Sequence, residues 1–385
     1  RAPGSPMSAY AVESTMDMVA ARIRMDPLQL RLKNTAKPGT QMVYGAKHAH
    51  AGFAETIQAL QRHPGYTAPL GKNQGRGVAS GYWFNGGGES SATVHVNEDG
   101  TVVVATGSPD IGGSRASMAL MAAEALGIPY DHVRPIIADT NSVGYTQATG
   151  GSRVTYATGI AVINACNKVI AEMCARAAKI WKVDAADVIW EDGCARPAGK
   201  RVGEFEPLPF KAIAAKRTAT GGPIGASASL NAEGQAPGFS AQFCDVEVDP
   251  ETGHVKILRY VAAQDVGRAI HPSYVEGQIH GGVVQGIGWA LNEEYIYDKA
   301  GRLTNAGFLD YRIPVASDLP MIETILVEVP NPNHPFGVKG VAEANIVPPM
   351  AAIANAIYHA IGRRMTELPM SPPKVLAALD SGRGG

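Results

Sequence analysis

The strongest constraint on the fold is a three-part pattern that occurs twice along the chain. Each copy has two alternating apolar segments joined by a tight turn, then a loop containing Asp-x-Gly, then a helical pattern. The copies cover residues 92–126 and 244–291. The recurrence predicts two similar lobes of mixed sheets and helices, an α+β fold, with the two loops facing each other across a ligand-binding crevice. Chance is the alternative, because strand–turn–strand units are common.

The segments outside the repeat carry weaker signals. Residues 156–182 are apolar and predict a long core helix, whereas residues 195–235, rich in Gly, Pro, Ala and Lys, predict a surface connection. A helical pattern opens the chain over residues 9–24. Its Glu13 and Asp17 lie one turn apart, which indicates a solvent-exposed pair. The same helix has an apolar stripe that we expect another chain to bury.

The composition limits the function classes. Of 385 residues, 45% are hydrophobic, which supports a large core. A net charge of −1, without a basic run, argues against binding to nucleic acid or to a membrane surface, and no apolar run reaches the ~18 residues of a membrane span. The ten histidines show no metal-ligand spacing, and the four cysteines are scattered. We therefore expect a reduced, cytoplasmic protein whose side chains hold no metal directly.

Three glycine-rich segments precede or form helices. The first contains Gly112, Gly113 and Ser114. The second is Thr149-Gly150-Gly151-Ser152-Arg153, where the free backbone N–H groups of a helix start could bind an anion and Arg153 could grip a phosphate. The third, residues 277–288, has five glycines in twelve residues and places Gln278 and Gln285 on one helix face. Tight packing is the alternative for each loop, and neither a Walker A nor a G-x-G-x-x-G pattern is present.

The last feature is a loop with one acid near the C-terminal end. Gly337 and Gly340 flank Lys339, Glu343 follows, and Pro348-Pro349 then opens an apolar helical pattern that ends at Gly362. A carboxylate held on such a loop can act as a general base. The alternative is an ordinary solvated glutamate.

The order of the motifs is similar to that of a known family. In chain order they are R-A-P-G-x-P, D-I-G, A-A-E-x-L-G-I-P, T-G-G-S-R, E-V-D-x-x-T-G, D-V-G-R-A-I-x-P, V-Q-G-I-G-x-A-L-x-E-E, D-Y-x-x-P and G-V-K-G-V-A-E. This series resembles the large, molybdopterin-binding subunit of the xanthine dehydrogenase/aldehyde oxidase family. The chain looks like the C-terminal half of that subunit, as in split-subunit bacterial hydroxylases resembling nicotinate or CO dehydrogenases.

The resemblance implies an architecture and a set of partners. Residues 1–45 would end the first molybdenum-cofactor-binding domain, and residues 46–385 would form the second, with lobes at about 75–190 and 236–385. The implied partners are the other half of the large subunit, an iron–sulfur small subunit and an FAD-binding medium subunit. The implied cofactor is molybdenum held by a pterin, in the cytosine dinucleotide form. The implied reaction is hydroxylation of an N-heteroaromatic or aldehyde carbon of a small molecule, with water as oxygen source.

The resemblance also implies residue roles. Glu343 would be the base. The cofactor-binding set would be Arg1, Gly112, Gly113, Ser114, Thr149, Gly150, Gly151, Ser152, Arg153, Gln278, Gln285 and Gly340. At Gly113 many relatives have a glutamine that contacts the pterin, and at Pro3 purine-oxidising relatives have an aromatic residue. The first departure leaves a non-catalytic cofactor-binding or assembly subunit as the alternative, and the second argues against a purine substrate.

Overall fold

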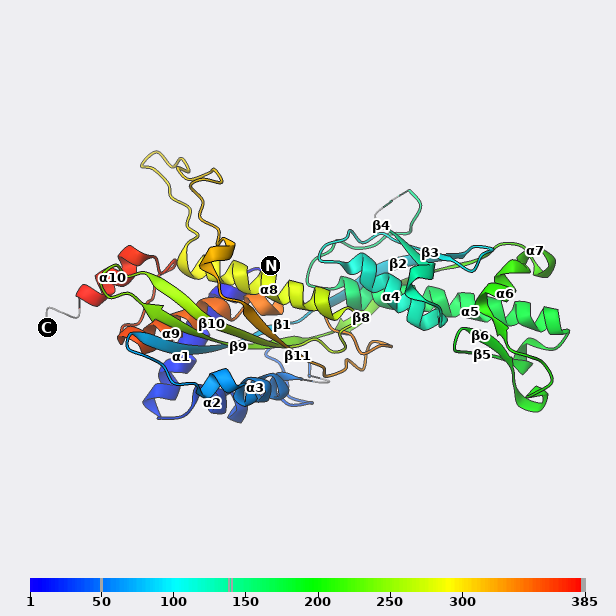
Figure 1. The fold of residues 1–385 in the computed structure, drawn as a ribbon, viewed down its shortest axis with the longest axis horizontal. Coiled ribbons are helices and arrows are strands. Elements are labelled where there is room, and N and C mark those ends of the chain that lie inside the picture. The colour runs from blue at the N-terminus through cyan, green and yellow to red at the C-terminus, as the bar shows by residue number, and fades with distance from the viewer. Residues whose placement is uncertain (49–50, 138, 140, 382–385) are drawn as a thin grey trace.

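Two lobes lie along the long axis of the molecule in the computed structural model, which describes residues 1–48, 51–137, 139 and 141–381 (Figure 1). Within these residues each lobe has one four-stranded sheet, with strand order β4-β3-β2-β8 in the first lobe and β1-β9-β10-β11 in the second. The strands of the first sheet are β2 (Gly86–Val96), β3 (Val102–Thr106), β4 (Val133–Ile137) and β8 (Ile224–Gln235). Those of the second are β1 (Gln74–Trp83), β9 (Gly238–Val248), β10 (Val255–Asp265) and β11 (Ile322–Val327).

The two lobes have the same topology. In the first, the antiparallel hairpin β2–β3 is followed by helix α4 (Ser114–Leu126), and β4 then pairs parallel to β3. In the second, the hairpin β9–β10 is followed by helix α8 (Pro272–Leu291), and β11 pairs parallel to β10. An antiparallel strand completes each sheet, β8 beside β2 and β1 beside β9. The predicted α+β fold of two repeated lobes is confirmed.

The sheets do not divide at the predicted lobe boundaries. Strand β1 leads into β2 after two residues, and β8 leads into β9 in the same way, so a two-stranded ribbon runs through both lobes. Consequently β1 belongs to the second sheet and β8 to the first. The prediction of a surface connection over residues 195–235 was wrong, because the twelve-residue β8 pairs along the whole of β2 and helix α6 (Phe210–Ala215) packs into the core.

One long helix packs under each sheet. In the first lobe this is α5 (Gly159–Trp181), which follows one turn of π-helix, η3 (Val154–Thr158). The segment Val154–Trp181 is long and apolar enough to cross a membrane, but 61% of its most apolar window is buried inside the fold, as in a core helix. In the second lobe it is α9 (Pro349–Ile361). There Gly77 of β1 lies so close to α9 that a methyl group would overlap the Ala352 carbonyl oxygen.

The N-terminal helix α1 (Ser5–Arg22) turns its acids inward, so the prediction of a solvent-exposed Glu13–Asp17 pair was wrong. Glu13 accepts hydrogen bonds from Arg31 and Ser80, and Asp17 accepts them from Arg364 and His359. Buried carboxylates are stable only when paired in this way. Ala20 of α1 is buried, but five large apolar side chains of α1 and its C-cap are at least 41% exposed: Met7, Val12, Met18, Val19 and Ile23.

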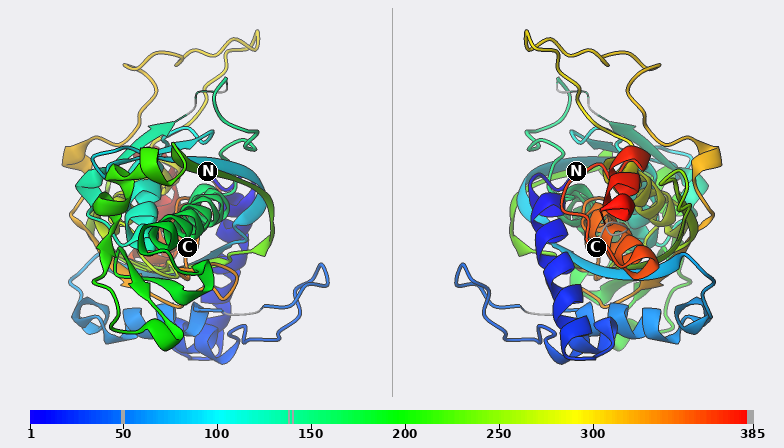
Figure 2. Two further views of the ribbon diagram at one scale, coloured as in Figure 1. Left: turned by 90° about the vertical axis from the view of Figure 1, so that its right-hand side faces the viewer. Right: turned by 90° about the vertical axis from the view of Figure 1, so that its left-hand side faces the viewer.

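The remaining elements surround these layers. The other α-helices are α2 (Pro27–Lys33), α3 (Phe53–Arg62), α7 (Arg217–Thr220) and α10 (Pro372–Asp380). A small third sheet has β5 (Val188–Glu191), β6 (Cys194–Pro197) and β7 (Leu208–Pro209). The short 3-10 turns are η1 (Pro64–Thr67), η2 (Tyr130–His132), η4 (Ala185–Asp187), η5 (Gly199–Arg201), η6 (Ala316–Asp318) and η7 (Ala344–Ile346). After α8, residues 292–315 project from the body as a long arm (Figures 1 and 2).

Candidate active site

A cavity of about 340 Å³ opens where loops of the two lobes meet the chain's first residue. Four loops line it, and all four were singled out in the sequence: residues 111–114, 149–155, 266–271 and 338–343, joined by the start of α8. The two Asp-x-Gly loops approach each other as expected, since Ile111 and Gly112 line the cavity together with Val266 and Arg268. The volume falls within the range of small-molecule sites, roughly 300–1,000 Å³.

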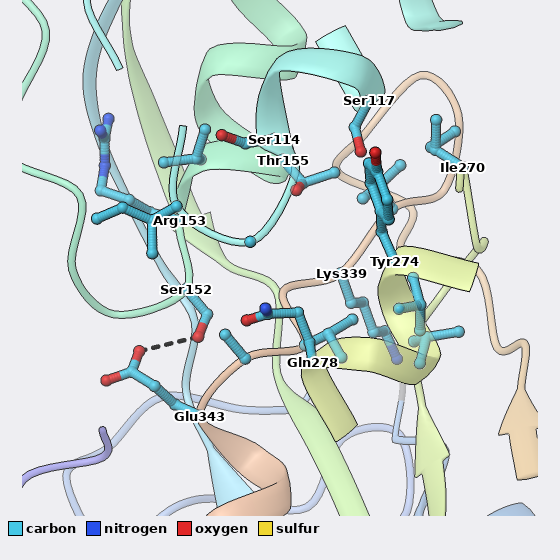
Figure 3. Close-up of a pocket in the computed structure, with 18 of the residues that line it drawn as sticks. Ser114, Ser117, Ser152, Arg153, Thr155, Ile270, Tyr274, Gln278, Lys339 and Glu343 are labelled. Atoms are coloured by element: carbon cyan, nitrogen blue, oxygen red, sulfur yellow. Dashed lines mark hydrogen bonds between the residues drawn. The ribbon is translucent and has the colours of Figure 1, made fainter. Parts of the chain in front are cut away.

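Glu343 stands at one end of this cavity and is only 9% exposed. One carboxylate oxygen accepts a hydrogen bond from the backbone N–H of Ala2 at 2.9 Å, and the other accepts one from the Ser152 hydroxyl at 2.9 Å (Figure 3). The two donors come from distant parts of the chain. They fix the orientation of the carboxylate while it faces the cavity, which is what a positioned base requires.

Arg1 lies near Glu343 and contacts Gln278. The Arg1 guanidinium donates to the Gln278 side-chain oxygen at 3.1 Å. Burial lowers the pKa of Arg1, and the nearby Glu343 carboxylate partly offsets that shift. Gln278 projects from α8 toward the centre of the cavity, where its amide can contact a ligand (Figure 3).

The first glycine-rich loop supplies closely packed backbone. Gly112 and Gly113 both have positive φ angles, +74° and +83°, which favour glycine. Any side chain at Gly113 would collide with the ring of Tyr274, which packs directly over it. Ser114 begins α4, and its side chain lines the cavity. Tyr274 therefore fills the space above Gly113.

The second glycine-rich loop faces the cavity through Thr149, Gly150 and Ser152. The Thr149 hydroxyl is buried and has no hydrogen-bond partner among the described residues. Such an unpaired group normally costs free energy, roughly 1–3 kcal/mol, unless a ligand or water satisfies it. This hydroxyl is a ready contact for a bound group.

Arg153 does not play the part predicted for its side chain. The guanidinium points away from the other lining residues (Figure 3). It donates to the carbonyl oxygens of Gly87, Gln147 and Glu89 and to the Ser90 hydroxyl, at 2.6–3.0 Å. All of its nitrogens are engaged within the first lobe, so the predicted grip on a phosphate is not available; only the rest of the residue lines the cavity.

Nine of the thirteen predicted site residues line the cavity: Arg1, Gly112, Ser114, Thr149, Gly150, Ser152, Arg153, Gln278 and Glu343. Gly113, Gly151, Gln285 and Gly340 lie outside its lining. Gln285 is two turns beyond Gln278 on α8, because a seven-residue spacing shares a helix face but also advances by about 10 Å. Gly340 is pressed against the Ser152 backbone and the Asn85 side chain, and so serves close packing.

Several lining residues were not predicted. His271 and Tyr274 stack at 3.9 Å between ring centroids beside the mouth, and Arg268 forms a two-pronged ion pair with Glu124 of α4. Lys339 is 1% exposed and pairs with Asp265 at 2.5 Å. The only sequence signal for the pair was its place in two glycine-containing loops. Among the described residues, no group of three or more His, Cys, Asp or Glu side chains could hold a metal ion.

Comparisons with known proteins show the family to which the chain belongs. Two family models, both described as molybdopterin cofactor-binding domain, match residues 49–320 and 1–35. A xanthine dehydrogenase molybdenum-binding subunit from Escherichia coli O157:H7 is 31% identical over 97% of this chain and 52% of its own length. The nicotine 6-hydroxylase large subunit of Paenarthrobacter nicotinovorans is 31% identical over 98% of this chain and 50% of its own.

The fold is shared with solved structures. Quinoline 2-oxidoreductase from Pseudomonas putida 86 superposes with a TM-score of 0.86 at 26% identity, over 97% of this chain and 52% of that one. The chain thus spans about half the length of the relatives that it matches. With a family model matched over most of its residues, this chain belongs to the molybdopterin cofactor-binding domain family, which includes the molybdenum-binding subunits of xanthine dehydrogenase.

Proposed function

We propose that the chain is part of the catalytic subunit of a cytoplasmic molybdenum hydroxylase that oxidises an N-heteroaromatic or aldehyde carbon. The balanced reaction converts R–H and water into R–OH, two protons and two electrons, and the electrons pass to iron–sulfur and FAD partner subunits. Relatives named for nicotine, quinoline and xanthine chemistry support a heteroaromatic substrate. Family membership supports the pterin, and we propose its cytosine dinucleotide form.

The residues around the cavity fit a bound pterin group. The unpaired Thr149 hydroxyl and the Gln278 amide offer donors, and the glycine backbone at Gly112 lets a ligand approach closely. Ser114 and Gly150 also line the cavity beside these groups, whereas we assign Arg153, Gly151 and Gly340 to shaping the loops. When bound, the molybdenum–pterin group supplies the two-electron redox chemistry.

Glu343 carries the proposal. Its carboxylate is nearly buried, faces the cavity and is oriented by Ala2 and Ser152, so it is poised to accept one proton as the oxygen of water moves to the substrate carbon. Arg1 keeps a positive charge close to the carboxylate.

Exposed apolar surfaces support a larger assembly. The outer face of α1 carries five large apolar side chains, and the arm after α8 carries Phe308 and Leu309, which are 102% and 94% exposed. Surfaces of this kind are typical of protein contacts. We propose that the exposed face of α1 contacts the other half of the large subunit. Residues 1–45 would then be the end of the first cofactor-binding domain of that subunit, and residues 46–385 the second domain.

A non-catalytic cofactor-binding subunit is the second candidate. One observation favours it: Tyr274 fills the space over Gly113, the position at which the family resemblance implies a glutamine that contacts the pterin. Such a subunit would bind the cofactor but show no dependence of turnover on Glu343.

The deciding experiment replaces Glu343 with glutamine in the assembled enzyme. Glutamine keeps the size of the side chain but cannot accept the proton, so the rate of metal reduction by substrate should fall about 10²–10⁴-fold. Molybdenum and released cytidine monophosphate per chain should stay near wild type. Glu251→Gln, the same change in the exposed turn between β9 and β10, is the matched control and should leave the rate unchanged. A Glu343→Gln enzyme with more than a tenth of the normal rate would refute the catalytic role.

A further inference from the structure

A layer of fully buried polar side chains lies beneath the loop that carries Glu343. Three amides from the two central strands and the β1–β2 junction each donate to one backbone carbonyl of this loop. Asn85 donates to Gly340, Gln264 to Val341 and Gln242 to Asn345, all at 2.9 Å. Each of these amides has an exposed fraction of 0%. Because the loop has no sheet or helix partner for these carbonyls, the amides take the place of one.

The layer ends in an ion pair. The Lys339 ammonium meets Asp265 at 2.5 Å, with side-chain exposures of 1% and 0%. Asp265 also accepts the backbone N–H of Gly267, and the Lys339 backbone N–H donates to the Val266 carbonyl. The second Asp-x-Gly loop and the Glu343 loop are therefore joined through both side chain and backbone.

The packing leaves this joint no room to shift. Side chains added at Gly267 or Gly52 would collide with the Gly337 carbonyl and the Asp265 carboxylate respectively. A buried ion pair contributes little net stability, because desolvation offsets its attraction, but separating its partners strands a charge in the interior. Losing this buried ion pair is more costly than losing one amide hydrogen bond, because it leaves an uncompensated charge in the interior. The pair thus fixes where the loop begins, four residues before Glu343.

We propose that Lys339 and Asp265 are positioning residues for Glu343, holding the loop so that its carboxylate stays between the Ala2 N–H and the Ser152 hydroxyl. The consequence for turnover rests on the proposed function. The anchoring itself does not, and it can be measured without substrate.

The first test is Lys339→Met in the assembled enzyme, read by amide hydrogen exchange of residues 337–347. Exchange there should accelerate at least tenfold, and kcat should fall tenfold or more while KM changes less than twofold. The matched control is Arg31→Met, which breaks the equally buried Arg31–Glu13 pair of α1 and α2. That variant should lower the unfolding temperature but leave both the loop exchange and kcat within twofold of wild type.

The second test is the double variant Lys339→Met/Asp265→Leu, which removes the stranded carboxylate. Its unfolding temperature should recover toward wild type, whereas loop exchange should stay fast and kcat low. Recovery of all three would mean that the pair serves stability alone and would overturn the proposal. So would loop exchange and kcat within twofold of wild type in Lys339→Met, or an equal change of both in Arg31→Met. If Glu343→Gln retains its rate, the proposed function fails, but the exchange measurement still decides whether the pair anchors the loop.

Discussion

The two lobes share a topology, but each holds the buried cation at its side of the cavity in a different way. In the first lobe, Arg153 spreads its charge over three carbonyl oxygens and one hydroxyl, all neutral acceptors. In the second, Lys339 faces a carboxylate, Asp265. Arg153 belongs to the side of the cavity that the first lobe forms, and Lys339 to the side that the second lobe forms. We call these sides the first wall and the second wall. The same strand, loop and helix order therefore supports two different electrostatic environments.

The difference separates the roles of the two walls. The first lobe presents hydroxyls and backbone, from Ser114, Thr149 and Gly150, and its loops carry no carboxylate into the cavity. The second presents Glu343, which can change its protonation state, and anchors it with a paired charge below. We infer that the first wall only binds, whereas the second also carries the reacting group. Removing Arg153 should therefore lower mainly the stability of the fold, whereas removing Lys339 should mainly loosen the Glu343 loop.

Arg153→Met should produce the largest loss of stability among the changes to the first lobe. It removes the donor from four acceptors, of which the Glu89 carbonyl and the Ser90 hydroxyl keep another partner. A cost of about 3 kcal/mol is expected from the usual 1–3 kcal/mol for each of the other two. Denaturant unfolding would measure this. Loop exchange over residues 337–347 should not change. Arg115→Met, 54% exposed at the side chain, is the control and should stay within about 0.5 kcal/mol of wild type. A loss below about 1 kcal/mol for Arg153→Met would contradict the structural role assigned to this guanidinium.

The repeat and the loops could be predicted from sequence because their signals are local. Turn residues, the two Asp-x-Gly loops and the glycines near Glu343 mark backbone that must bend or pack closely, whatever surrounds it. The exchange of β1 and β8 between the sheets has no local sequence signal. It depends on which strands meet in space, and residues 224–235 contain few of the large β-branched residues that mark a strand.

The direction of charged side chains was equally hidden. Glu13 and Asp17 have the spacing of a surface pair, yet their partners Arg31 and Arg364 lie 18 and 347 residues away. Arg153 sits in a loop whose glycines suggest anion binding, but its acceptors are carbonyls that any residue could supply. The local sequence does not show such distant partners, so sequence analysis predicts that these charged side chains face solvent or a ligand.

His334 lies where the two lobes are in contact. It lies on the segment that leads to the Glu343 loop and packs 6.0 Å from the ring of Tyr156 in the first lobe. Burial lowers the pKa of His334 to about 4, so the folded protein keeps the imidazole neutral. The unfolded chain protonates near the ordinary value of about 6.5. Stability from this group is therefore present above about pH 6.5 and is lost as the pH falls toward 4.

Between pH 7 and pH 5 the loss should be about 2 kcal/mol, from the 1.36 kcal/mol that each pH unit is worth. His334→Asn keeps an acceptor for the Phe336 N–H but cannot take up a proton in this range. The stability gap between wild type and the variant should shrink by that amount as the pH is lowered, as followed by urea midpoints. Parallel pH curves for the two proteins would show that His334 is not held neutral where the lobes are in contact.

Thr149→Val should have the smallest effect, and on binding rather than folding. The Thr149 hydroxyl is buried and unpaired, so replacing it with a methyl group of similar shape removes an unsatisfied polar atom and should leave the cofactor-free protein equally or slightly more stable. If the first wall binds the cofactor through this hydroxyl, losing one hydrogen bond of about 1 kcal/mol should weaken retention several-fold. The amount of pterin per chain after extended dialysis measures this retention.

Thr158→Val is the matched control, because Thr158 is also buried but bonded to Ser90 and Ser108. It should lower stability with little change in retention. If instead Thr149→Val destabilised the cofactor-free protein as much as Thr158→Val, its hydroxyl would have a partner within the fold, and the division between a binding wall and a reacting wall would lose its clearest support.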